Sequence, residues 1–160
     1  MKFLLLGFLF TGHAFAHQNT VTKSGQKLYF PENEISLELI NSPSQISSLK
    51  TREIVEESLA TWTQTGTRLK LKSAPSVHKI QFENDFSRYG SSVIGVTEIN
   101  FNSAGVIQKA VVKINNSAPL SANKDAQKNL KIYLGDVLSH ELGHFIGLNH
   151  SEVLSSTMFY

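Results

Sequence analysis

Three histidines and a glutamate lie close together in the stretch HELGHFIGLNH, which covers residues 140–150. Residues four apart in a helix share one face, so the imidazoles of His140 and His144 can reach a single ion. Imidazole is a common zinc ligand, and Glu141 follows the first histidine, where a carboxylate can act as general base beside the metal. These residues predict a metal site that performs chemistry.

The third histidine is separated from the other two by a glycine. Gly147 comes three residues after His144, where a helix must end if the chain is to turn back. Glycine adopts the left-handed conformation that ends a helix at little cost. The chain can then return and bring His150 to the ion. Three neutral imidazoles hold Zn²⁺ and leave a fourth position for water, so we predict one catalytic Zn²⁺ bound by His140, His144 and His150.

The elements that position this site follow from the apolar spacing. We predict one helix over about 126–146, which carries the first two histidines, and another over about 49–63, where Val55, Leu59 and Trp62 recur at helical spacing. Alternating apolar residues and turn residues predict five strands between or before them. These strands cover about 35–39, 68–72, 77–82, 92–101 and 106–114.

The last two predicted strands read as a hairpin with Gly105 at its turn. The order of strands and helices predicts an α+β fold, in which two helices pack on a twisted mixed sheet of about five strands. His78 stands apart from the cluster, and we interpret it as an ordinary core or surface histidine.

The histidine stretch resembles a known family. HELGHFIGLNH matches His-Glu-x-x-His-x-x-Gly-x-x-His, the consensus of the metzincin metallopeptidases. Met158 follows His150 by a short gap, with Ser151 directly after the third histidine, and this is similar to the matrixin, or matrix metalloproteinase-like, branch. The resemblance is strong over 135–159 and collinear over 28–115. It implies a metzincin-like catalytic domain over residues 28–160.

The resemblance also implies an activity, that of a zinc-dependent endopeptidase. The ion would lower the pKa of a bound water to about 7 and polarise the substrate carbonyl. Glu141 would be the general base, Gly147 the turn, and Met158 an apolar floor under the imidazoles. The strand at 92–101 would form the cleft edge, along which an extended protein or peptide substrate binds antiparallel.

The sequence departs from the family in several ways. It has no cysteine, so latency through a cysteine bound to zinc is excluded, and it lacks the aspartate-rich loop of the animal enzymes' structural metal sites. It ends two residues after Met158, so we expect the C-terminal helix of the family to be absent. The alternative is therefore a truncated protein that binds zinc but is catalytically weak or inactive. The presence of Glu141 argues against it, because a structural site needs no base.

The 160 residues suggest a single domain preceded by a signal peptide at 1–16, with an apolar run at 3–10 and Ala-Phe-Ala at 14–16. We expect 17–27 to be flexible. The absence of cysteine fits a bacterial periplasmic or secreted protein. Cleavage would leave His17 as the N-terminus, and an N-terminal histidine can bind copper. A copper-binding protein is therefore a second alternative to the zinc endopeptidase. The net charge is +2 without a charged block, so we expect no binding to nucleic acid or, after cleavage, to a membrane. We also expect a monomer.

Overall fold

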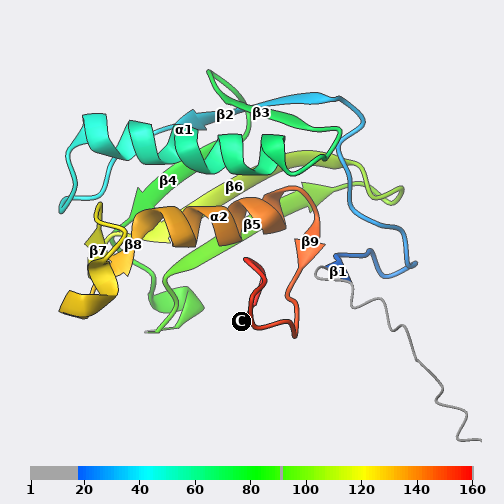
Figure 1. The fold of residues 1–160 in the computed structure, drawn as a ribbon. Helices are drawn as coiled ribbons and strands as arrows, with labels where there is room; N and C mark the ends of the chain where they lie inside the picture. The colour runs from blue at the N-terminus through cyan, green and yellow to red at the C-terminus, as the bar shows by residue number, and fades with distance from the viewer. Residues whose placement is uncertain (1–17, 91, 160) are drawn as a thin grey trace, which may run out of the picture.

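The computed structural model describes residues 18–90 and 92–159 (Figure 1). The predicted signal peptide, and His17 with its copper hypothesis, lie outside the described residues. The main strands are β2 (Glu34–Leu39), β3 (Lys70–Ser73), β4 (Lys79–Glu83), β5 (Gly95–Phe101) and β6 (Ile107–Asn115). They form one sheet in the order β3-β2-β4-β6-β5. All neighbours are parallel except β5, which runs antiparallel to β6.

Two α-helices cover one face of this sheet (Figure 1). They are α1 (Ser48–Gln64) and α2 (Leu134–Phe145). The predicted α+β fold, with a mixed five-stranded sheet and two helices, is therefore confirmed. Each predicted strand is present, with bounds shifted by a few residues, and the β5–β6 hairpin turns at Gly105, whose φ is +83°. None of the helices in the described part of the chain is long and apolar enough to cross a membrane.

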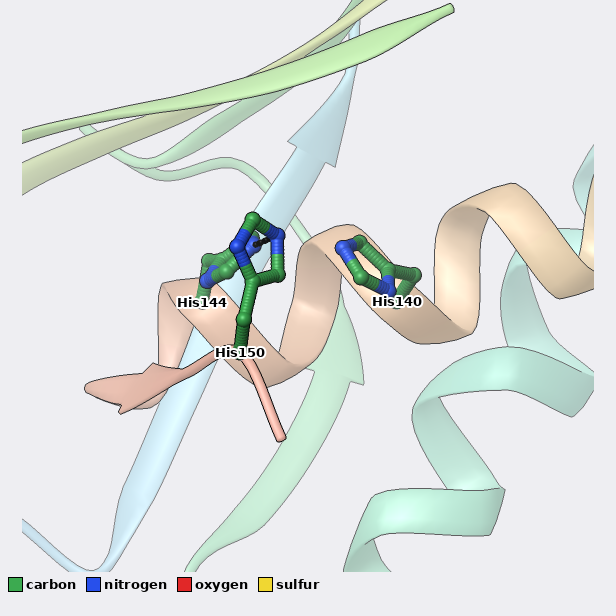
Figure 2. A group of neighbouring side chains, drawn as sticks. All are labelled: His140, His144 and His150. Atoms are coloured by element: carbon green, nitrogen blue, oxygen red, sulfur yellow. Dashed lines mark hydrogen bonds between the residues drawn. The ribbon is translucent and has the colours of Figure 1, made fainter. Parts of the chain in front are cut away.

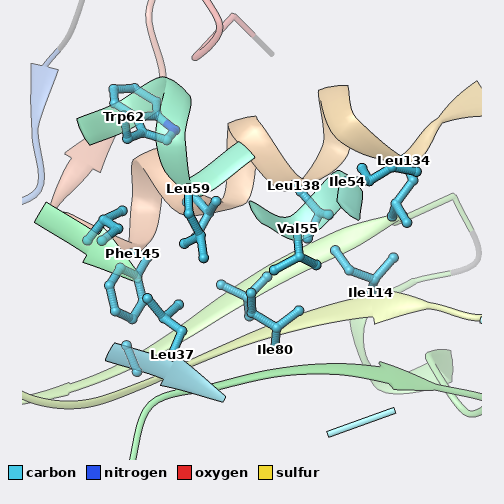
Figure 3. Close-up of a cluster of buried hydrophobic side chains, with 14 of the residues drawn as sticks. Leu37, Ile54, Val55, Leu59, Trp62, Ile80, Ile114, Leu134, Leu138 and Phe145 are labelled. Carbon is cyan, nitrogen blue, oxygen red and sulfur yellow. The ribbon is translucent and has the colours of Figure 1, made fainter. Parts of the chain in front are cut away.

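The two faces of the sheet differ because successive side chains of a strand point to opposite sides. On the inner face Leu37 and Ile80 are fully buried against the helices (Figure 3). The outer face carries charged residues that pair across neighbouring strands, as Lys72 does with Glu34. The sheet therefore packs on one side only, and the molecule has two layers.

Helix α1 fixes the position of α2. Its N-cap is Ser47, whose hydroxyl accepts a hydrogen bond from the backbone N–H of Lys50 at 3.3 Å. Its buried stripe contacts α2 and the sheet (Figure 3). At the end of this stripe, Trp62 donates its ring N–H to the carbonyl of Ser139 in α2 at 2.8 Å. The helix that carries the histidines is thus held by both packing and a hydrogen bond.

The predicted start of this second helix, at about residue 126, is wrong. The chain there forms a 3₁₀ turn, η2 (Ala126–Asn129), and then a short strand, β8 (Ile132–Tyr133), which pairs in parallel with β7 (Leu120–Ser121). Leu130 has a φ of +56°, which no right-handed helix accommodates, and its side chain is 91% exposed. Its place in the helical apolar pattern was therefore coincidental.

Residues 18–27, predicted to be flexible, make ordered backbone contacts. The strand β1 (Gln18–Asn19) pairs antiparallel with β9 (Leu148–Asn149), directly after α2. The N–H of Thr20 donates to the carbonyl of Gly147 at 2.8 Å. Strand pairing uses main-chain groups and needs no apolar side chains, so the polar composition of this segment gave no sign of the pairing.

A further short 3₁₀ turn, η1 (Ser87–Tyr89), lies between β4 and β5.

Candidate metal centre

Helix α2 and the strand that follows it bring the three predicted histidines together (Figure 2). His140 and His144 lie one turn apart on α2, and His150 comes directly after β9. One ring nitrogen from each lies within 4.8 Å of the others. In residues 18–90 and 92–159, this is the one group of three or more histidine or acidic residues with such spacing.

The spacing and chemistry of the group fit zinc. Nε2 of His144 lies 3.2 Å from Nε2 of His150. Ligand nitrogens at about 2.1 Å from a tetrahedral zinc ion stand about 3.4 Å apart, so this pair is already at ligand spacing. The ring centroids of the three histidines lie between 4.8 and 5.2 Å apart, so the ring of His140 belongs to the same group (Figure 2).

Hydrogen bonds to backbone carbonyls fix the protonation of two of the rings. Nδ1 of His140 lies 2.9 Å from the carbonyl oxygen of Thr157, and Nδ1 of His144 lies 2.9 Å from that of Leu148. A carbonyl only accepts, so each Nδ1 carries the hydrogen, and the Nε2 lone pair is left for a metal. The Thr20 hydroxyl donates to the same Leu148 carbonyl at 3.1 Å.

Burial favours the neutral form of two of the histidines. It lowers the pKa of His144 below the usual value, although the hydrogen bond to the Leu148 carbonyl opposes this shift, and the nearby His140 adds to the lowering. Burial also lowers the pKa of His150, and His144 and His140 add to the effect. Neutral imidazole is the form that binds a metal, so the local electrostatics favour metal binding at neutral pH.

Gly147 lies at the turn that brings His150 back to the helix. Its φ is +94°, and its N–H donates to the carbonyl of His144 at 2.9 Å. A β-carbon at this position would also stand 2.6 Å from the carbonyl oxygen of Leu28. Both the backbone conformation and the close approach of a neighbouring segment therefore require glycine here.

Met158 lies fully buried beside α2, among the residues that support the histidines. Its sulfur and the ring of Trp62 both lie close to the position that a β-carbon would take at Gly143, on the turn between the two helical histidines. The preceding residue, Thr157, supplies the carbonyl that orients His140. Met158 thus anchors the segment that holds one of the three rings.

Glu141 lies against the edge strand β5. Its side chain is only 6% exposed. The hydroxyl of Thr97 lies 2.7 Å from its Oε2 and 2.9 Å from its main-chain carbonyl oxygen. A β-carbon on Gly95 would stand 2.6 Å from Oε1, so the absence of a side chain at Gly95 makes room for the carboxylate. Burial raises the pKa of Glu141 above the usual value, although the Thr97 hydrogen bond opposes this shift.

The histidines and Glu141 open into a cleft of about 400 Å³ between α2 and β5. Sequence reasoning did not single out three of its lining residues: Thr20, Gly95 and Thr97. A signal for two of them exists, because Gly95, Thr97 and Ile99 share one face of a strand, and glycine inside a strand often marks a close approach. The position of Thr20 depends on the long-range pairing of β1, for which the sequence has no local sign.

Comparison with known proteins places this site in a family. The family model described as Matrixin matches residues 29–160. No curated protein matches the chain. The matched range contains the three converging histidines, Glu141, the turn at Gly147 and the buried Met158. The chain belongs to the matrixin family of metallopeptidases.

Proposed function

We propose that this protein is a zinc-dependent endopeptidase that hydrolyses peptide bonds of extended polypeptides. The observation that carries the proposal is the position of Glu141. Its carboxylate lies in the same cleft as the three histidines and is almost fully buried. A structural zinc site has no use for a buried carboxylate that binds no metal, whereas hydrolysis needs a base at this place.

The residues of the chain have separate roles in the proposed reaction. Nε2 atoms of His140, His144 and His150 would hold one Zn²⁺, which when bound activates a water molecule and polarises the substrate carbonyl. Glu141 takes a proton at its carboxylate from the attacking water and passes it to the leaving nitrogen. The burial that raises its pKa helps the carboxyl to hold the proton between these two transfers.

The edge of the sheet supports binding of an extended peptide. The N–H of Asn115 donates to the carbonyl of Ile94 at 2.8 Å, which places Ile94 in a bonded pair with β6. Alternation along an antiparallel pair then directs the main-chain groups of Gly95, Thr97 and Ile99 outward. A substrate strand can pair with these groups and lie across the cleft.

The opposite edge of the sheet differs in a way that favours β5 as the binding edge. Strand β3 carries the exposed Lys70 and Lys72, and lysine on an edge strand discourages pairing with another chain. On β5 the cleft-facing residues Gly95, Thr97 and Ile99 are uncharged, and Glu98 on the opposite face is paired with Lys113 of β6. Of the two edge strands, β5 is therefore the one that a substrate strand can pair with more readily.

The decisive experiment compares Glu141→Gln with the unchanged protein. Gln has the same shape but is no base, so we expect stoichiometric zinc and a loss of peptide cleavage of about 100-fold or more. Glu56→Gln, on the exposed face of α1, is the matched control and should cleave normally. If zinc-loaded protein cleaves neither an unfolded protein nor a peptide library, the endopeptidase proposal fails, and the protein is a zinc-binding member of the family without turnover.

We also propose that the protein acts outside the cytoplasm as a monomer. The support is the sequence pattern of residues 1–16, with its apolar run and small-residue cleavage motif. N-terminal sequencing of the exported protein should begin at His17. A mature chain that still begins at Met1 would contradict the proposal. Light scattering should give the mass of one chain.

A further inference from the structure

Strand β5 holds the proposed base through one hydroxyl group. The Thr97 Oγ1 lies 2.7 Å from Oε2 of Glu141 and 2.9 Å from its carbonyl oxygen. A hydroxyl has one hydrogen to donate, and both acceptors belong to the same residue. The hydroxyl therefore ties the main chain and the carboxylate of Glu141 to the same point of the sheet.

The second carboxylate oxygen is left for chemistry. Oε1 lies beside Gly95, where any β-carbon would stand 2.6 Å away. Among the described residues Oε1 accepts no hydrogen bond, and in the same part of the chain no buried side-chain oxygen or nitrogen lacks a partner. Oε1 must therefore reach the solvent of the cleft, which Gly95 and Glu141 both line.

We propose that Thr97 is a positioning residue that anchors Oε2 of Glu141, so that Oε1 is the oxygen that exchanges the proton. The inference rests on the proposed peptidase function, because it assigns the two oxygens of that base. Without this anchor, the carboxylate can rotate about its terminal bonds, and a smaller fraction of molecules presents Oε1 to the cleft.

The position of Thr97 on the strand adds a second consequence. Its main-chain groups are among those that point outward from β5, where the substrate would pair, while its hydroxyl points inward to Glu141. Thr97 would thus contact the substrate strand through its main chain and the base through its side chain. The distance between the scissile bond and the carboxylate is set within β5, with no flexible segment between them.

The test uses Thr97→Val, which keeps the shape but removes the hydroxyl, and Thr97→Ser, which restores it. We expect Thr97→Val to lower kcat by about 10- to 100-fold with little change in KM or bound zinc. Thr97→Ser should recover most of the lost kcat. Thr51→Val is the matched control, because the buried Thr51 hydroxyl in α1 donates to the carbonyl of Ser47, the N-cap of that helix, far from the proposed base. This variant should cleave normally.

A measurement without zinc or substrate tests the contact itself. In the metal-free protein, Thr97→Val should lower the Tm more in the presence of Glu141 than in a Glu141→Ala background, because only the first pair loses the carboxylate contact. Equal Tm shifts in the two backgrounds would overturn the inference.

Two outcomes of the kinetic experiment would also overturn it: full kcat in Thr97→Val, or equal impairment of the Val and Ser variants. An unchanged protein that binds zinc and cleaves nothing would instead refute the proposed function, so the two failures can be told apart.

Discussion

The sulfur of Met158 lies so close to Gly143 that a β-carbon at position 143 would stand 2.1 Å from it. A ring carbon of Trp62 would stand 3.0 Å from the same β-carbon. Met158 is fully buried, so it cannot move into solvent to make room. The turn of α2 between the two helical histidines therefore packs directly against Met158. The size of the side chain at position 143 decides how closely this turn and Met158 can pack.

Replacement of this glycine should destabilise the protein, although alanine is the better helix former. We expect Gly143→Ala to lower the free energy of unfolding by about 1–3 kcal/mol, because overpacking outweighs the gain of about 1 kcal/mol in helix propensity. Denaturant unfolding of the metal-free protein measures the change. Met158→Ala should partly rescue it, so that the double variant is more stable than the sum of the two losses predicts. An additive double variant would show that the two residues do not collide.

Removal of metal should lower thermal stability. A ligand that binds only the folded state adds about 2.7 kcal/mol at a concentration of 100 times its Kd. We therefore expect a chelator to lower the Tm and added Zn²⁺ to restore it, with one zinc ion per chain by elemental analysis. The His150→Ala variant should show a much smaller response to zinc, because it keeps only His140 and His144. A Tm of the unchanged protein that does not respond to chelator or zinc would contradict the metal site.

His78, a half-buried histidine outside the site, should make stability depend on pH. His78 packs edge-on against Phe30 and Phe145, and its Nδ1 accepts a hydrogen bond from the N–H of Ala110 at 3.1 Å. Burial lowers its pKa below the usual value, and the charge of Glu32 offsets only part of the shift. Below a pH of about 6.5, the unfolded chain then binds more protons than the folded one. Stability should fall as the pH drops from that value toward the folded pKa.

The variant His78→Asn separates this effect from the other histidines. Asn keeps an acceptor for the Ala110 N–H but does not titrate. Urea unfolding at pH 7.5 and pH 5.5, in excess chelator, should show a smaller loss of stability in the variant than in the unchanged protein. His144 and His150 titrate in both proteins, so their contribution cancels in the comparison. An identical loss in both would show that His78 is not the source.

The parts of the fold that the sequence predicted were those set by local spacing. The four-residue interval between His140 and His144 and the turn at Gly147 describe a small local geometry, and the structure has it. The period-two strands and the hairpin at Gly105 were found for the same reason. The start of the second helix was missed because Leu130 fits the helical period while its backbone is left-handed. Periodicity records side-chain type and carries no information on φ.

The parts that the sequence did not reveal depend on contacts between distant segments. The roles of Gly95 and Thr97 appear only when β5 lies beside α2, a contact across 44 residues. Threonine is common in strands, and the glycine at position 95 indicates only that some group approaches closely, without saying which one. The ordered pairing of β1 with β9 was missed because polar residues can form a ladder with any suitable edge.

The pairing of β1 with β9 has a consequence for how the proposed zinc site would form. Thr20 and Leu148 are 128 residues apart, and their contact closes most of the chain into one loop. His140 and His144 come together as soon as α2 forms, whereas the strand before His150 is held by this late, long-range closure. A half-folded chain would then present two ligands and hold zinc loosely. Tight zinc binding should therefore occur at the rate of the slowest folding step. The rate of zinc binding would then measure the rate at which β1 pairs with β9.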